Sequence, residues 1–199
     1  GNIKNNIISG NIKTSNASYS ASALHLRRIQ VNQSYEVSGN LIHDNTGSPV
    51  VLLEAGGVQE PYIEFDIKNN TITKNTGSPV VSIDVKEDPY VQYDFSENNI
   101  FGNIGDLALE YRNKLGSNSL DVEGNYWGTA DAAVIATKVY DWNEDSSLGF
   151  IDYTPYASNL YTTNPIAPPS GVSAQTGPTT MQLTWTANAD ADNAGYKVY

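Results

Sequence analysis

The strongest constraint on the fold is a heptapeptide that occurs twice without change. Asn-Thr-Gly-Ser-Pro-Val-Val occupies residues 45–51 and again residues 75–81, an offset of 30 residues. An identical word of this length at a fixed offset indicates that the chain is built from structural repeats. A unit of this size cannot bury an apolar face alone and becomes stable when neighbouring units stack. The sequence therefore predicts a solenoid.

Two asparagine positions recur once per repeat and align the units. The first set is Asn6, Asn40, Asn70, Asn98 and Asn125, and the second, five residues later, is Asn11, Asn45, Asn75 and Asn103. An asparagine amide both donates and accepts, so equivalent asparagines in stacked coils can chain their hydrogen bonds. We expect about five coils joined by two asparagine ladders.

Apolar and polar residues alternate in the segments that precede the first ladder position. In residues 62–67, Ile63, Phe65 and Ile67 fall on one face of a strand and the polar residues fall on the other. No helical period runs through residues 1–125. The pattern predicts an all-β chain whose apolar columns point into the core.

The Asn-x-Ile and Gly-Asn-x-Ile words of residues 1–156 resemble the repeats of right-handed parallel β-helix proteins of the pectate-lyase-like class. The resemblance implies a right-handed parallel β-helix. It implies no single activity, because this scaffold carries lyases, hydrolases, epimerases, adhesins and proteins without known chemistry.

The pattern closes at residues 125–129, and a capping helix is expected over residues 130–142. Ile135, Val139 and Trp142 would form its apolar stripe, and Thr129 or Asp131 would cap its start. Residues 125–155 are similar to the C-terminal closure of many secreted bacterial and archaeal β-helix proteins, which implies a secreted or cell-surface protein.

A linker is predicted over residues 157–169, between the β-helix of residues 1–156 and a last segment of residues 170–199. That segment resembles the first strands of a fibronectin type III domain, with Trp185 as its core tryptophan. About 30 residues are present where such a β-sandwich has roughly 100, so we expect partial sandwich strands that are disordered or lean on the β-helix.

Charge excludes several partners. The chain has 11 Lys+Arg against 22 Asp+Glu, a formal charge of −11. Such a chain repels nucleic acid and anionic membranes, and it has no apolar run of the length that membrane insertion needs. Cations and neutral polymers such as polysaccharides fit better. Because Gly1 opens inside a repeat, we expect a fragment whose neighbours are upstream β-helix coils of the same chain.

One carboxylate per coil stands four residues before the first ladder asparagine: Glu36, Asp66, Asp94 and Asp121. Alternation places them outside, where mutual repulsion would raise their pKa values or recruit a cation. Carboxylates from adjacent coils could supply several of the six to eight oxygens that Ca²⁺ needs. They are the candidate metal ligands, and Ca²⁺ is the candidate cofactor. The alternative is a solvated acidic face.

Tyr62 and Tyr90 lie beside this column and are the candidate ligand-binding residues, since flat exposed aromatic rings can carry sugar rings. The alternative is ordinary packing between coils, because tyrosine is often half-buried.

Catalytic residues are not predicted. The strands that follow the repeated heptapeptide, residues 50–53 and 80–83, offer almost only apolar side chains, and Glu110 is the exception in the next coil. His25, Arg27 and Arg28 could serve acid–base chemistry, but no carboxylate lies near them in sequence. We interpret them as the edge of a coil. Asp141, Asn143 and Asp145 are interpreted as a capped acidic turn.

Three functions remain open. The first is a non-catalytic binding or scaffold segment of a carbohydrate-associated protein. The second is part of a polysaccharide lyase or glycoside hydrolase whose catalytic coils lie mostly upstream, and the third is a surface adhesin or spacer. Paired acidic residues on adjacent outward strands with Arg or Lys nearby would favour the enzyme. A smooth surface with few loops would favour the spacer.

Overall fold

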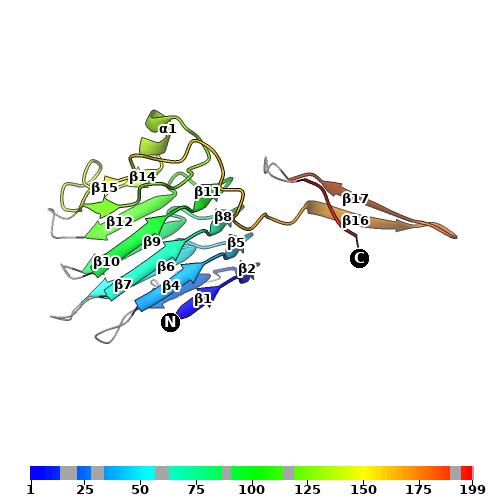
Figure 1. Cartoon of the computed structure of the whole chain (residues 1–199), viewed down its shortest axis with the longest axis horizontal. Helices are drawn as coiled ribbons and strands as arrows, with labels where there is room; N and C mark the ends of the chain where they lie inside the picture. Colours follow the sequence, from blue (N-terminus) through cyan, green and yellow to red (C-terminus); the bar gives the residue numbers. More distant parts are fainter. Residues whose placement is uncertain are drawn as a thin grey trace.

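The computed structural model shows an all-β chain with a parallel β-solenoid of about four turns and almost no helix (Figure 1). The description covers residues 1–13, 22–27, 34–56, 63–86, 91–113, 119–188 and 194–198. The predicted fold class is therefore confirmed, with about four turns rather than five. Within these residues, no helix is long and apolar enough to cross a membrane.

Three parallel sheets form the walls of the solenoid. Sheet A contains β1 (Asn2–Lys4), β4 (Ser34–Ser38), β7 (Ile63–Lys68) and β10 (Val91–Ser96). Sheet B contains β2 (Ile7–Ser9), β5 (Leu41–His43), β8 (Thr71–Thr73) and β11 (Asn99–Phe101). Sheet C contains β3 (Leu24–Arg27), β6 (Val51–Gly56), β9 (Val81–Lys86), β12 (Leu109–Asn113) and β14 (Val139–Tyr140). Each coil thus contributes one strand to each sheet.

The core is built from side chains that repeat at the same place in successive coils. Phe65 on β7 is fully buried, and its ring stacks between Tyr35 and Tyr93, with ring centroids 5.5 and 5.4 Å away. Val51 and Val81 on sheet C belong to the same buried cluster. In-register stacking of like residues explains why the apolar spacing of the sequence is so regular.

Both asparagine ladders are confirmed, and both are buried in the middle coils, whereas Asn6 and Asn11 of the first coil are exposed. Asn70 donates its Nδ2 to the Oδ1 of Asn98 at 3.0 Å, and Asn40 donates in turn to Asn70 at 2.9 Å. In the second ladder Asn45 donates to Asn75, and Asn75 donates to Asn103. Every donation from one ladder asparagine to the next runs toward the later coil, so each ladder has a direction.

The C-terminal closure contains a helix that is shorter than predicted. Helix α1 spans only Ala132–Ala136, and the Asp131 carboxylate caps it by accepting from the N–H of Ala133. The predicted stripe breaks after Ile135, because Val139 joins β14 and pairs with Leu109 instead. Pairing with a neighbouring strand thus overrides the helical period of the sequence here. Trp142 does not pack into the solenoid and is exposed.

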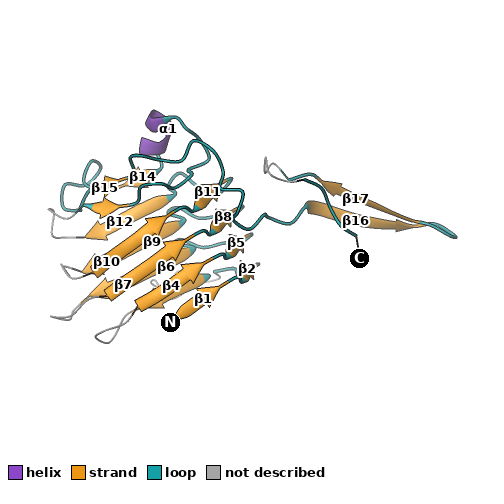
Figure 2. Ribbon diagram, in the orientation of Figure 1, coloured by secondary structure: helices purple, strands orange, loops and turns teal. Residues whose placement is uncertain are grey.

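The predicted linker begins as a strap that packs on the solenoid. Tyr161 exchanges two hydrogen bonds with the side chain of Asn99, and Asn164 donates to the carbonyl of Glu97 at 2.8 Å. The chain then leaves the solenoid and forms an antiparallel hairpin of β16 (Ser170–Thr176) and β17 (Met181–Thr186) (Figure 2). Residues 194–198 are not part of a strand.

Candidate functional site

The outer face of sheet A carries the predicted carboxylate column. Glu36, Asp66 and Asp94 lie directly opposite one another on β4, β7 and β10. Asp121 lies on β13 (Leu120–Asp121), which pairs with β15 (Ile151–Asp152) rather than with β10. Three of the four carboxylates therefore form one row, and the fourth stands beyond the edge of sheet A.

Lysines two residues further along the strands neutralise this row. Lys4 Nζ lies 2.6 Å from Glu36, and Lys68 bridges Asp66 and Asp94. The hydrogen bond from Lys4 lowers the pKa of Glu36. Partial burial of Asp94 opposes its ionisation, but hydrogen bonds from Lys68 and Ser96 outweigh it and lower its pKa. The expectation of raised pKa values is therefore wrong for Glu36 and Asp94.

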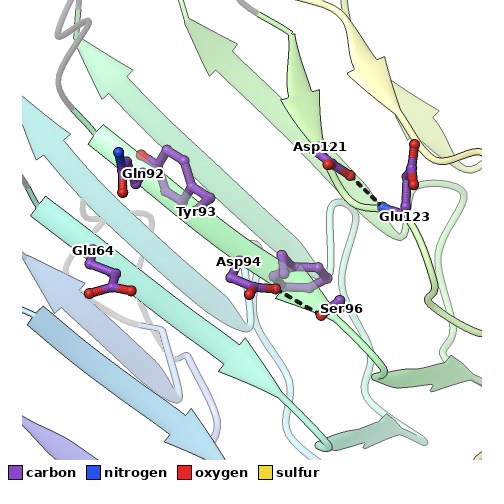
Figure 3. Close-up of a pocket in the computed structure, with 8 residues that line it drawn as sticks. Glu64, Gln92, Tyr93, Asp94, Ser96, Asp121 and Glu123 are labelled. Carbon is purple, nitrogen blue, oxygen red and sulfur yellow. Dashed lines mark hydrogen bonds between the residues drawn. The ribbon is translucent and has the colours of Figure 1, made fainter.

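The row ends at an open groove between β10 and β13, with a volume of about 490 Å³ (Figure 3). Its lining consists of Glu64, Gln92, Tyr93, Asp94, Phe95, Ser96, Asp121 and Glu123. Among the described residues, no lysine or arginine contributes to that lining. Partial desolvation and the neighbouring carboxylates of Asp121 and Asp152 raise the pKa of Glu123. The groove is thus a region of negative potential with many hydrogen-bond acceptors.

Metal ligation is not apparent in the arrangement of these acids. Within the described parts of the chain, no group of three His, Cys, Asp or Glu side chains is placed to hold a metal ion. Asp121 instead accepts the backbone N–H of Glu123 at 3.0 Å. Calcium binding at the four carboxylates stays a prediction. Tyr62 and Tyr90, the predicted sugar platforms, lie outside the described residues.

The outer face of sheet C holds charges that the sequence interpretation missed. Glu54 Oε2 lies 3.2 Å from His25 Nε2 and 3.6 Å from Arg27 Nε. No carboxylate lies near His25 and Arg27 in sequence, but the fold places Glu54 beside both. Arg28 lies outside the described residues. The coil brings Glu54 beside His25 across 29 residues of sequence. Extending the segment 50–53 by one outward position would have found Glu54.

The same outward row continues across the next two strands. Arg27, Glu54, Asp84 and Arg112 lie opposite one another in register. Glu110 is almost buried and accepts from Ser82 at 3.3 Å, while Arg112 Nε lies 2.8 Å from its carboxylate. Sheet C therefore presents two acidic residues on adjacent outward strands with an arginine at each side.

Comparison with known proteins leaves the fold as the firm result. No protein-family model, no curated protein and no solved structure matches the chain. The resemblances to pectate-lyase-like repeats and to fibronectin type III strands therefore stay predictions. What is established is a parallel β-solenoid with buried asparagine ladders, an acidic groove at the end of sheet A and a mixed-charge row on sheet C.

Proposed function

We propose that this chain is a non-catalytic binding and scaffold segment of a secreted, carbohydrate-associated β-helix protein, and that the groove between β10 and β13 binds a neutral polysaccharide. The observation that carries the proposal is the open groove of about 490 Å³, whose described lining contains no lysine or arginine. Sugar hydroxyls are hydrogen-bond donors and acceptors, and Gln92, Asp94 and Asp121 offer complementary carboxylate and amide groups.

The electrostatics of the groove select against anionic polysaccharides. An anionic polymer such as a polyuronate would meet Glu64, Asp121 and Glu123, and no cation belongs to the described part of the lining. A neutral chain meets no such repulsion. Because the groove walls are strands and turns of a stacked solenoid, its shape is held by the asparagine ladder at Asn98 and Asn125, and little ordering is needed on binding.

The double substitution Asp121→Ala and Glu123→Ala is expected to weaken binding of a neutral oligosaccharide by tenfold or more. Hydrogen bonds to charged groups contribute about 1.5–3 kcal/mol each, and tenfold in Kd corresponds to about 1.4 kcal/mol. Isothermal titration calorimetry against cellohexaose, mannohexaose and xylohexaose provides the measurement. Asp106→Ala removes a similar charge from an exposed turn that is not part of the groove lining and is the control.

Unchanged affinity in the double variant, or stronger binding of polygalacturonate than of any neutral sugar, contradicts the proposal. The same titrations with and without millimolar Ca²⁺ test calcium as a cofactor. A calcium-dependent rise in melting temperature or affinity supports ligation by Glu36, Asp66, Asp94 and Asp121. Identical titration and melting curves with and without calcium would contradict calcium binding at these carboxylates.

A second candidate function, a polysaccharide lyase or glycoside hydrolase, is favoured by the row on sheet C. Glu54 and Asp84 are neighbouring outward carboxylates, and Arg27 and Arg112 flank them. A lyase would release unsaturated uronate from polygalacturonate, and a hydrolase would release reducing ends from neutral polymers. Product formation that is lost in Glu54→Gln and Asp84→Asn would establish the enzyme. Absence of product and of glycan binding would favour the adhesin or spacer.

Upstream coils of the same chain are the proposed partner at the other end of the solenoid. Strands β1, β2 and β3 each pair with a later strand on one side only, within the described residues. Ile7 and Ile12 are exposed there. A further coil would cover both isoleucines and add one strand to each of the three sheets.

A further inference from the structure

The loop between β14 and β15 lies at the C-terminal closure of the solenoid (Figure 1). It carries two exposed aromatic side chains. Trp142 and Phe150 are each 40% exposed, and their rings stack with centroids 4.6 Å apart and planes inclined by 28°. The two rings form one contiguous apolar patch. It is separate from the groove, because neither residue contributes to the lining of the groove.

Asp141 holds this loop in a fixed shape. Its buried carboxylate accepts from the N–H of Ile151 at 2.7 Å and from the backbone and side chain of Asn143 at 2.9 and 3.0 Å. The loop closes again where Trp142 N–H donates to the carbonyl of Gly149 at 3.1 Å. The loop is therefore fixed by hydrogen bonds next to Trp142 and next to Phe150. A ligand would meet a preorganised surface.

The loop that carries the aromatic pair is polar and contributes no cation. Residues 141–151 contain no Lys or Arg, while Asn143 and Glu144 are exposed beside Trp142. Hydrogen bonds from the backbone and side chain of Ser147 lower the pKa of Asp145, so this carboxylate is ionised at neutral pH. The rim offers acceptors to hydroxyl groups and repels anions.

Packing of the cap does not explain the exposure of the pair. Ile135 and Val139 already fill the space between the cap and the last full coil, and Leu148 anchors the loop. Exposed flat apolar surface with a polar rim is characteristic of a binding surface. We propose that Trp142 and Phe150, with the rim of Asn143, Glu144 and Asp145, form a second binding site for the pyranose rings of a neutral polysaccharide.

The geometry favours a sugar ring over a cation. A pyranose has an apolar C–H face that lies flat on an indole, and hydroxyls at its edge reach the surrounding acceptors. An organic cation is held best by aromatic rings that surround it, whereas these two rings stack on each other and leave no space between them. Phe150 thus supports the indole of Trp142, and the exposed part of the indole is the surface on which a sugar ring would lie.

The site is tested by titrating the whole chain with cellohexaose, mannohexaose and xylohexaose. Calorimetry and tryptophan fluorescence measure the binding. Trp142→Ala is expected to weaken binding at this site at least tenfold and to remove the fluorescence change, since Trp127 is buried. Phe150→Ala should weaken it less, and Trp142→Phe should restore part of the affinity. Trp185→Ala is the matched control, because Trp185 is 37% exposed on β17.

Three results would overturn the proposal. They are no binding of any hexasaccharide, unchanged affinity and fluorescence in a folded Trp142→Ala protein, and binding of tetramethylammonium that competes with the sugar. The Asp121→Ala, Glu123→Ala double variant separates the two sites. It should leave the Trp142 fluorescence response intact, so that failure of the groove proposal and failure of this one give different results.

Discussion

Asn70→Ala is expected to lower the free energy of unfolding by about 3–6 kcal/mol, because it leaves several buried polar groups without hydrogen-bond partners at once. The Asn70 side chain donates to the carbonyl oxygens of Val37 and Lys68 at 2.8 and 2.9 Å and to Asn98 Oδ1 at 3.0 Å. It also accepts from the N–H and Nδ2 of Asn40. Alanine satisfies none of these groups, and each unsatisfied buried group costs about 1–3 kcal/mol.

Urea denaturation followed by circular dichroism measures the effect. Asn6→Ala is the control within the same ladder. Asn6 donates to Lys4 and Asn40 but lies in the first coil, where it is exposed. It should cost about 1 kcal/mol. Asn159→Ala, an exposed asparagine outside the ladders, should be neutral. Equal losses at positions 6 and 70 would show that the ladder does not stabilise the coils through burial.

The ladders could be predicted because each coil repeats the same word and the stacked register makes like residues neighbours. Asn70 meets Asn98 for the same reason that both precede an apolar residue at the same spacing. Contacts between residues at different positions of the repeat were harder to predict than contacts between equivalent residues. Lys68 reaches Asp94 in the next coil, so the charge of the carboxylate row is set by a second column two residues away.

The sequence interpretation of sheet C failed for a related reason. The window of residues 50–53 ended one outward position before Glu54, and the partner of His25 lies in the following coil. His25 and Glu54 are neighbours in stacked coils although 29 residues separate them in sequence. The repeat offset does not lead to Glu54 either, because Arg27 and Glu54 are register partners 27 residues apart while Asn6 and Asn40 of the same two coils are 34 apart. The groove has no such signal, because it arises where β13 pairs with β15 instead of continuing sheet A.

The cap shows a different limit. Ile135, Val139 and Trp142 have the spacing of a helix, and this period is real in the sequence. The structure uses only the first turn as helix, because Val139 gains a ladder partner in Leu109. Local periodicity gives no information about such long-range pairing, and a β-branched residue fits a strand readily. The exposure of Trp142 follows from this change and could not be predicted from the stripe.

Gly77→Ala is expected to destabilise the solenoid by about 3 kcal/mol or more, although the substitution adds only one methyl group. A Cβ at Gly77 would lie 1.9 Å from the carbonyl oxygen of Gly47 and 3.1 Å from its carbonyl carbon, which are backbone atoms of the preceding coil. The backbone cannot move away easily. Gly47 N–H donates to Thr76 and Gly77 N–H donates to Ile104, both at 2.9 Å. Relief of the clash would break this turn-to-turn ladder.

Gly10→Ala separates this steric effect from the conformational preference of glycine. Gly10 has a φ of 70°, and no atom lies within 4 Å of the place that an added methyl group would take, so alanine there should cost only about 1–2 kcal/mol. Gly77 lacks a positive φ, and its requirement is for space alone. Thermal and urea denaturation of both variants compares the two costs. If Gly77→Ala were no worse than Gly10→Ala, close approach of the coils would not explain the glycine in the repeated heptapeptide. The expected difference would instead assign that glycine to the spacing between coils, as Gly105 repeats the same contact 2.1 Å from the carbonyl oxygen of Gly77.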